Sequence, residues 1–268
     1  RGVLKVGDRE IHCSNRSGHG VLDLRHALME SCNAALMDIG LKLKRDKFIK
    51  YNELYGFGQR TGIDLPGEAY GLVHTEDTMG PTELATSTFG QGYTVTMVQQ
   101  AAAFSSLING GNYYQPHVMK TITDSTGAVV ESNEPNLVRQ TVSAEISDKM
   151  RSFLQGVVTD GSGQSAKVAG YTMGGKTGTA QKYPRGNGKY LVSFIGFAPV
   201  ENPNKPLTKE QKKRNHKVAL IAIIILEALS CGLYVFFPKV SALIAYTLFS
   251  IAVLILISKN RKGGNEYE

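Results

Sequence analysis

Tryptophan is absent from this 268-residue sequence, and cysteine occurs only three times, at Cys13, Cys32 and Cys231. The cysteines have no Cys-x-x-Cys spacing and no histidine at a metal-binding spacing, which argues against a zinc module. The sequence therefore favours three isolated thiols. A pairing of Cys13 with a cysteine upstream of Arg1 is the alternative that stays open.

The net charge of +7 could suggest a nucleic-acid partner, but the absence of tryptophan argues against this interpretation. No aromatic residues alternate with basic ones in the manner of a base-stacking surface. Residues 208–268 carry nine Lys or Arg and four Glu, so most of the excess charge lies in the tail, beside apolar stretches. That pattern is typical of a juxtamembrane segment, and we expect no nucleic-acid partner.

The start of the chain has neither a methionine nor a segment that resembles a signal peptide. We therefore expect a fragment of a longer reading frame, with any export signal upstream. The composition changes near Lys205. It predicts a globular mixed domain over 1–204, a basic linker over 205–217, two membrane helices within 218–258 and a polar tail over 259–268.

Hydrophobic periodicity and capping residues predict an α+β fold for the first region. Helices are expected from Asp23 through Ser31, from Ala34 to Lys44, from an Asp46 cap to Gly56, from Thr94 or Thr96 to Ile108, and from Ala144 to Val158. Antiparallel hairpins are expected for Val118–Thr123 with Ala128–Glu131, and for Tyr171–Gln181 with Tyr190–Ala198.

Two long apolar segments follow. Val218–Phe237 holds a single charge, Glu227, and Val240–Ser258 holds none. Each is long enough to cross a hydrocarbon layer as a helix, so a two-helix transmembrane hairpin in contact with lipid is expected. Basic residues flank the pair on both outer sides, which predicts that both ends face the cytoplasm. The alternative for Val218–Leu226 is a β-strand.

The sharpest local motif is Lys176-Thr177-Gly178-Thr179 on an expected strand. A lysine on an edge strand would supply positive charge beside a cleft, and Gly178 would let a substrate approach the backbone. Thr177 and Thr179 would offer hydroxyls to a carboxylate. On the motif alone, an ordinary edge strand with a solvated lysine is the favoured interpretation.

A second motif, Ser31-Cys32-Asn33, lies between two expected helices. Its hydroxyl and amide can face one cleft, where they could relay a proton and bind a peptide amide. Ser and Asn are also common as helix caps, so the triplet alone carries little weight.

Together, in this order, the two motifs match two of the three signatures of penicillin-binding proteins and class A β-lactamases. Further stretches resemble class B penicillin-binding proteins of the cell-division or sporulation type and do not resemble β-lactamases. They are Ile11-His12-Cys13, Gly18-His19-Gly20, Tyr55–Gly58, Thr61–Glu68 and Phe89–Gly92. The resemblance covers roughly residues 3–200.

The resemblance implies a serine acyl-transferase that cross-links peptidoglycan stem peptides, is trapped by β-lactams and needs no metal or other cofactor. It implies that Ser31 relays a proton, that Asn33 holds the substrate amide and that Lys176 attracts the substrate. Thr177, Gly178 and Thr179 would form the substrate-binding strand, with the Thr179 N–H in the oxyanion hole. The domain would lie on the outer face of the cell membrane.

The chain departs from this family in three respects. No serine is followed by a lysine three residues later, so the S-x-x-K nucleophile is missing, and the chain as given should neither cross-link peptidoglycan nor react with penicillin. Only two of the family's five sheet strands are expected. The cytoplasmic ends predicted for the tail conflict with an external domain, which suggests a fused or misassembled reading frame.

Two other functions stay open. One is a non-catalytic binding or scaffold module, a remnant tethered to the membrane by its tail. The other is a small membrane protein whose function lies in the tail itself.

Overall fold

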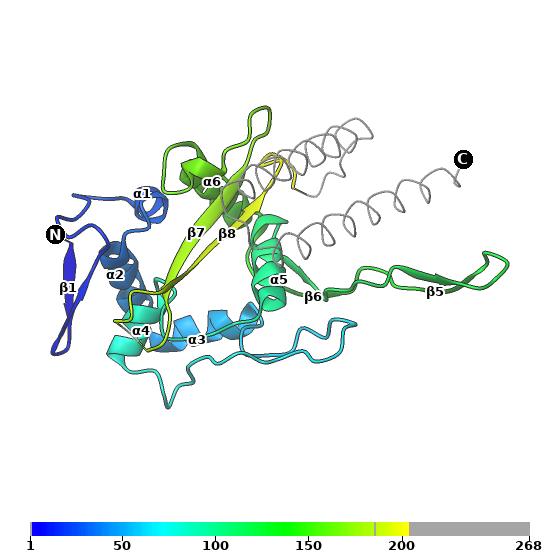
Figure 1. Ribbon diagram of the computed structural model, residues 1–268, viewed down its shortest axis with the longest axis horizontal. Helices are drawn as coiled ribbons and strands as arrows, with labels where there is room; N and C mark the ends of the chain where they lie inside the picture. Colours follow the sequence, from blue (N-terminus) through cyan, green and yellow to red (C-terminus); the bar gives the residue numbers. More distant parts are fainter. Residues whose placement is uncertain (1, 185, 204–268) are drawn as a thin grey trace, which may run out of the picture. The chain divides into compact units, whose positions relative to one another are not determined.

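The computed structural model of the protein describes residues 2–184 and 186–203, which belong to the first of two units, Arg1–Lys205. Six α-helices and four two-stranded antiparallel sheets make up this part of the chain (Figure 1). The predicted α+β class is therefore confirmed. The hydrophobic core is divided into small clusters, each formed where a helix packs on another helix or on a hairpin.

An N-terminal hairpin that the sequence did not predict is formed by β1 (Val3–Val6) and β2 (Arg9–His12). Gly7 lies in the tight turn with a φ of 62°, a conformation that glycine adopts without steric cost. Val6 is buried and clusters with Met37. A four-residue strand with one buried side chain carries too little alternation to be recognised from sequence.

Four helices follow the hairpin: α1 (Leu24–Met29), α2 (Asn33–Leu43), α3 (Arg45–Leu54) and α4 (Pro81–Ser87). The predicted Asp23 cap is confirmed, because its carboxylate accepts a hydrogen bond of 2.8 Å from the His26 N–H. The predicted Asp46 cap is wrong. Lys44 occupies that position and Asp46 lies in the first turn, where its charge still favours the positive end of the helix dipole.

Helix α5 (Met97–Ile108) is capped by Thr96, one of the two predicted starts, and a capping box between Thr96 and Gln99 satisfies two backbone N–H groups. Helix α6 (Ala144–Thr159) is capped by Ser143. A core cluster of Phe104, Ile108 and Leu154 joins the two helices, so together they form the support for the last hairpin.

Two small sheets extend from α5. Strand β3 (Asn112–Tyr114) pairs with β6 (Leu137–Gln140), and β4 (Thr121–Thr123) pairs with β5 (Val129–Ser132). The second pair is the predicted hairpin, shorter than expected. Its side chains are exposed, which explains why only the turn residues marked it clearly in the sequence.

The last hairpin consists of β7 (Gly174–Gln181) and β8 (Tyr190–Phe197), paired without a register shift. A Cβ on Gly174 would lie 2.5 Å from the Phe197 ring and 3.2 Å from the Gln155 nitrogen of α6, so only glycine allows this packing. On β8, Val192 is 75% exposed. The predicted hairpin is confirmed, and it is the whole of this sheet within the described residues.

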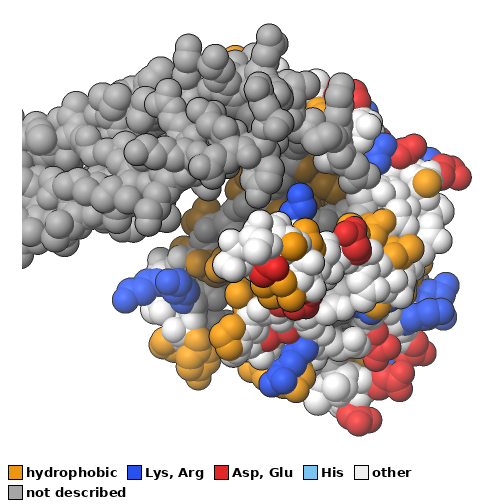
Figure 2. Space-filling view, turned by 90° about the vertical axis from the view of Figure 1, so that its right-hand side faces the viewer, with side chains coloured by type: hydrophobic (Ala, Val, Ile, Leu, Met, Phe, Trp, Pro, Cys, Tyr) orange, Lys and Arg blue, Asp and Glu red, His pale blue; other side chains and the backbone are white. Residues whose placement is uncertain are grey.

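Charged side chains are dispersed on the face of the described region shown in Figure 2, where Lys and Arg lie among Asp and Glu. None of the described helices is long and apolar enough to span a membrane. The predicted transmembrane hairpin at 218–258, its strand alternative at Val218–Leu226, the linker and the polar tail all lie outside the described residues.

Candidate active site

Ser31 occupies a sharp turn between two helices. Helix α1 ends at Met29, and α2 begins with Cys32 as its N-terminal cap. Ser31 has a φ of 51°, in the left-handed region that non-glycine residues seldom adopt. The turn is held by the Ser31 N–H, which donates to the Leu28 carbonyl at 3.2 Å. Strained residues of this kind concentrate at functional sites.

Lys176 reaches this turn from β7. Its Nζ donates to Ser31 Oγ at 2.9 Å and also to the backbone carbonyl of Thr177 at 3.0 Å. Burial lowers the pKa of Lys176, because the charged ammonium loses water. The solvated edge lysine considered above therefore does not describe this residue.

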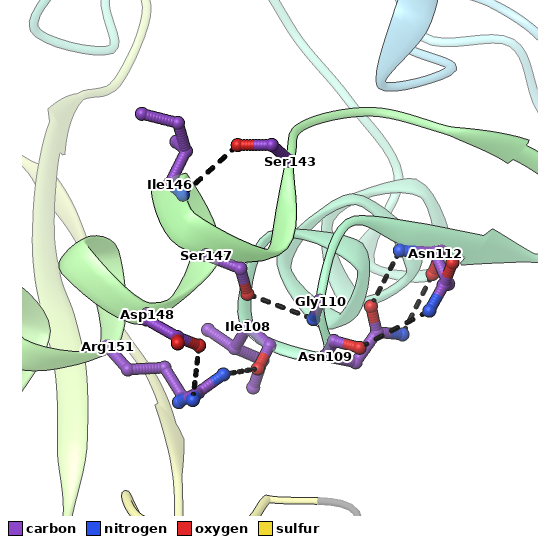
Figure 3. A network of polar contacts seen from close by, with 9 residues as sticks. All are labelled: Ile108, Asn109, Gly110, Asn112, Ser143, Ile146, Ser147, Asp148 and Arg151. Carbon is purple, nitrogen blue, oxygen red and sulfur yellow. Dashed lines mark hydrogen bonds and ion pairs between the residues drawn. The ribbon is translucent and has the colours of Figure 1, made fainter.

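A network of polar contacts holds helix α6, on which strand β7 packs (Figure 3). Ser147 Oγ of α6 accepts a hydrogen bond of 3.0 Å from the Gly110 N–H, and Arg151 Nη1 donates to the Ile108 carbonyl at 3.0 Å. Asp148 holds the same guanidinium at 2.6 Å. These contacts attach α6 to the end of α5. Since β7 packs on α6, the network sets the position from which Lys176 extends.

Thr177 is joined to a residue that sequence reasoning missed. Its Oγ1 lies 3.1 Å from Ser162 Oγ, and the Ser162 N–H donates to the Met29 carbonyl at 3.0 Å. Ser162 thus connects β7 to the end of α1. Its only sequence signal is a position between Gly161 and Gly163, just after α6, which is too common to single out a site residue.

Gly178 and Thr179 continue the strand. A Cβ on Gly178 would lie 2.6 Å from Ser193 Oγ on β8, so a larger residue here would require the Ser193 hydroxyl to rotate away. The carbonyl of Thr179 accepts a hydrogen bond of 3.4 Å from Gln91 Nε2, and the Thr179 side chain is exposed. Gln91 belongs to a stretch noted for its resemblance, but its contact with the strand was not predicted.

Asn33 lies at the first position of α2, on the side of the turn that faces β2. Its Nδ2 donates to the His12 carbonyl at 3.4 Å. Within the described part of the chain, no hydrogen bond joins Asn33 to Ser31 or Lys176. The structure therefore joins Ser31, Lys176 and Thr177 directly and places Asn33 beside them.

The prediction of isolated thiols is wrong for two of the three cysteines. Cys13 Sγ and Cys32 Sγ are 4.0 Å apart, both residues are buried, and His19 Nδ1 lies 3.8 Å from Cys13 Sγ. The sequence missed this cluster because Cys32 comes from the turn before α2, whereas Cys13 and His19 come from the connection between β2 and α1, and only the fold brings the two segments together. Cys231 lies outside the described residues.

Comparison with known families places this site in context. The family described as "Penicillin binding protein transpeptidase domain" matches residues 4–217, and "Accessory gene regulator B" matches the shorter segment 189–258. Stage V sporulation protein D of Bacillus subtilis is 42% identical over 210 residues, which cover 76% of this chain and 32% of that protein. Penicillin-binding protein PbpB of Mycobacterium tuberculosis is 29% identical, with 75% and 31% covered.

Solved structures agree with these sequence matches. Penicillin-binding protein 3 of Mycobacterium tuberculosis, in complex with ampicillin, superposes with a TM-score of 0.68 at 30% identity, covering 75% of this chain and 47% of that one. The D,D-transpeptidase domain of a peptidoglycan glycosyltransferase from Eggerthella lenta gives 0.69 at 28% identity, covering 75% and 51%. The chain spans about a third of the length of the curated relatives it matches.

Proposed function

The chain belongs to the family of penicillin-binding protein transpeptidase domains, and from this premise we propose that it is the later part of a class B peptidoglycan D,D-transpeptidase. The observation that carries the proposal is the 2.9 Å hydrogen bond from Lys176 Nζ to Ser31 Oγ. It joins two motifs that lie 145 residues apart in the sequence. A lysine within hydrogen-bond reach of a serine hydroxyl is positioned to exchange a proton through that hydroxyl.

We assign the chemical roles as follows. Ser31 relays a proton through its hydroxyl while Lys176 keeps that hydroxyl oriented and attracts the negative end of the substrate. Asn33 binds the amide of the stem peptide. Thr177 and Thr179 bind the terminal carboxylate of the peptide, or the equivalent carboxylate of a β-lactam. Gly178 lets the substrate lie along β7, with the Thr179 N–H donating to the oxyanion.

The reaction also needs a nucleophile that this sequence does not contain. A serine hydroxyl must attack the carbonyl carbon between the two terminal D-alanines, forming an ester as the last D-alanine leaves with a proton on its amine. An amine from a neighbouring stem peptide then attacks the ester and frees the serine. We propose that an S-x-x-K segment upstream of Arg1 supplies this serine in the complete protein.

Covalent labelling tests this function. The chain as given, incubated with fluorescent penicillin, should give no labelled band, because loss of the nucleophile costs on the order of a million-fold in such enzymes. The chain extended upstream through an in-frame S-x-x-K segment should give one band that survives boiling in detergent. Labelling of the chain as given, or no labelling of the extended chain, would contradict the proposal.

The tail supports a second proposal, which concerns location. Its two long apolar segments and the match of 189–258 to accessory gene regulator B favour two membrane helices within 218–258, between a basic linker at 205–217 and a polar end at 259–268. Membrane lipid would then be a partner. An external transpeptidase domain and cytoplasmic ends cannot both belong to one family topology, so we propose that domain and tail come from fused reading frames.

A further inference from the structure

A cluster of three metal-ligating side chains lies immediately behind the Ser31 turn. Cys13 follows β2, His19 lies in the loop before α1, and Cys32 caps α2. Cys13 Sγ is 3.8 Å from His19 Nδ1 and 4.0 Å from Cys32 Sγ, and all three atoms lie within 4.8 Å of one another. In the described ranges, this is the one group of three or more such ligands gathered closely enough to share an ion.

The spacing of these atoms fits a tetrahedral metal ion. With zinc–sulfur bonds of about 2.3 Å, two thiolates on one tetrahedral zinc lie roughly 3.8 Å apart, close to the 4.0 Å between the two sulfurs here. The distance from Cys13 Sγ to His19 Nδ1 fits equally well. Two thiolates and an imidazole form a soft ligand set, which selects zinc-like ions over magnesium or calcium.

The surroundings hold the ligands in place. The backbone N–H of Cys13 donates to the Gly2 carbonyl at 2.8 Å, and that of Cys32 donates to the Ala27 carbonyl at 3.0 Å. Backbone N–H groups also point at the sulfurs, including that of Asn33 at Cys13 and that of Ala35 at Cys32. Hydrogen bonds to coordinating atoms are the outer support that metal sites require.

The three side chains differ in their exposure to solvent. Cys13 and Cys32 are 2% and 4% exposed, whereas His19 is partly exposed. An ion could therefore enter from the His19 side and meet two thiols already held inside. Ser14 Oγ, 3.9 Å from Cys13 Sγ, or a water could complete the fourth position. Two buried thiols serving only as small apolar side chains would have no need of an imidazole beside them.

We propose that the reduced chain binds one Zn²⁺ through Cys13 Sγ, Cys32 Sγ and His19 Nδ1. Each thiol gives up its proton on binding, and His19 binds as the neutral ring with its remaining proton on Nε2. Cys32 is the middle residue of the Ser31-Cys32-Asn33 triplet. The ion therefore joins the segment after β2 to the turn that carries Ser31, and it stabilises that turn whether or not the domain has its nucleophile.

Cobalt binding provides the test. We would use the full chain in a mild detergent, with Cys231→Ser as the background so that only the described thiols remain. The protein would be kept reduced by a non-thiol reductant and titrated with Co²⁺ alone. The expected result is one equivalent bound, with thiolate-to-cobalt charge-transfer absorption and the strong visible bands of a tetrahedral ion, both removed by one equivalent of Zn²⁺.

Variants locate the site. Cys13→Ser and Cys32→Ser should abolish the charge-transfer band, and His19→Ala should weaken binding by more than about tenfold. His12→Ala, which changes an exposed histidine beside Cys13, is the matched control and should bind as the parent does. Circular dichroism would check that each variant folds. X-ray absorption at the zinc edge of the Cys231→Ser parent, which depends on no ligand variant, should show two sulfur ligands and at least one nitrogen.

Two outcomes would overturn the proposal. One is a reduced parent that shows no tetrahedral thiolate–cobalt spectrum, including the case in which Cys13 and Cys32 form a disulfide on purification and bind no metal after reduction. The other is a spectrum that persists in Cys13→Ser and in Cys32→Ser, which would place the metal elsewhere.

Discussion

Lys176 Nζ lies 2.9 Å from Ser31 Oγ, although the two residues belong to a C-terminal strand and to an early interhelical turn. Helix α6 makes this meeting possible, because β7 packs on one part of it and α1 on another. Both residues carry a local cost. Ser31 has a left-handed backbone conformation, and Lys176 has lost part of its hydration. Costs of this kind at adjoining residues are expected where a site is organised for chemistry rather than for stability.

The lowered pKa of Lys176 predicts how stability depends on pH. Burial disfavours the charged ammonium, so the folded state bears a cost for as long as the lysine is protonated. Between the lowered folded pKa and the ordinary value of 10.5, the unfolded state binds more protons, so the free energy of unfolding rises with pH. Lys176→Met should lack this contribution.

Urea titrations of the parent and of Lys176→Met, from pH 7 to pH 10.5, would measure the contribution of Lys176 to the free energy of unfolding. The free energy of unfolding of the parent, relative to the variant, should increase towards alkaline pH. Taking the difference cancels the titration of other groups. A difference that stays constant, or that falls with pH, would mean that Lys176 is hydrated in solution.

The left-handed conformation of Ser31 predicts an unusual order of stability between two variants. Ser31→Gly and Ser31→Ala both remove the hydroxyl, but only alanine keeps the Cβ that crowds the backbone in this region. Ser31→Gly should therefore be more stable than Ser31→Ala by about 1 kcal/mol. Urea unfolding measured side by side would decide, and an alanine variant as stable as the glycine variant would exclude strain at the turn.

Several features of the fold were accessible from local sequence. The Asp23 cap and the start of α5 near Thr96 were recognisable because a cap and its partner lie within one helical turn. The β7–β8 hairpin was recognisable from two strand-like runs joined by a Pro- and Gly-rich loop. In each case the deciding interaction spans only a few residues, so a short window of sequence contains the whole signal.

Other features depend on contacts between distant segments. The β1–β2 hairpin is stabilised through Val6, which has a partner only once α2 has packed. Helix α4 is seven residues long and begins at Pro81, so its periodicity is weak. The Cys13–Cys32 contact and the bond between Ser162 and Thr177 join separate segments. The sequence indicated which residues could carry a given chemistry, but it did not show which residues they contact in the folded chain.

The charge pattern of the tail predicts its topology. Eight basic residues flank the two apolar segments on their outer sides, and only Lys239 lies between them. Both ends should therefore face the cytoplasm. Glu227 opposes insertion by roughly 2.5–3.5 kcal/mol, but the many Ile, Leu and Val residues around it offset this at about 0.3–0.6 kcal/mol each.

Reporter fusions after Pro206 and after Glu268, with enzymes active on one side of the membrane only, would measure this topology. Both should report the cytoplasm. If both report the cell exterior, the charge argument fails, and the tail could then be a native partner of an exported transpeptidase domain.

We expect Ser31 and Lys176 to act as one unit, and a double-mutant cycle measures the coupling between them. In the extended chain that carries an upstream S-x-x-K segment, the measured quantity is the rate of acylation by fluorescent penicillin. Ser31→Ala and Lys176→Ala should each lower this rate roughly ten- to hundredfold, the worth of a charged hydrogen bond. Lys189→Ala, an exposed lysine in the same hairpin, is the control and should react as the parent does.

The double variant Ser31→Ala/Lys176→Ala decides the matter. We expect its rate to be close to that of the slower single variant, because removing either partner already breaks the same interaction. Thermal melts would confirm that all four proteins remain folded. If the two losses multiply, or if Lys176→Ala reacts at the parent rate, the two residues do not work together and Lys176 does not orient the Ser31 hydroxyl.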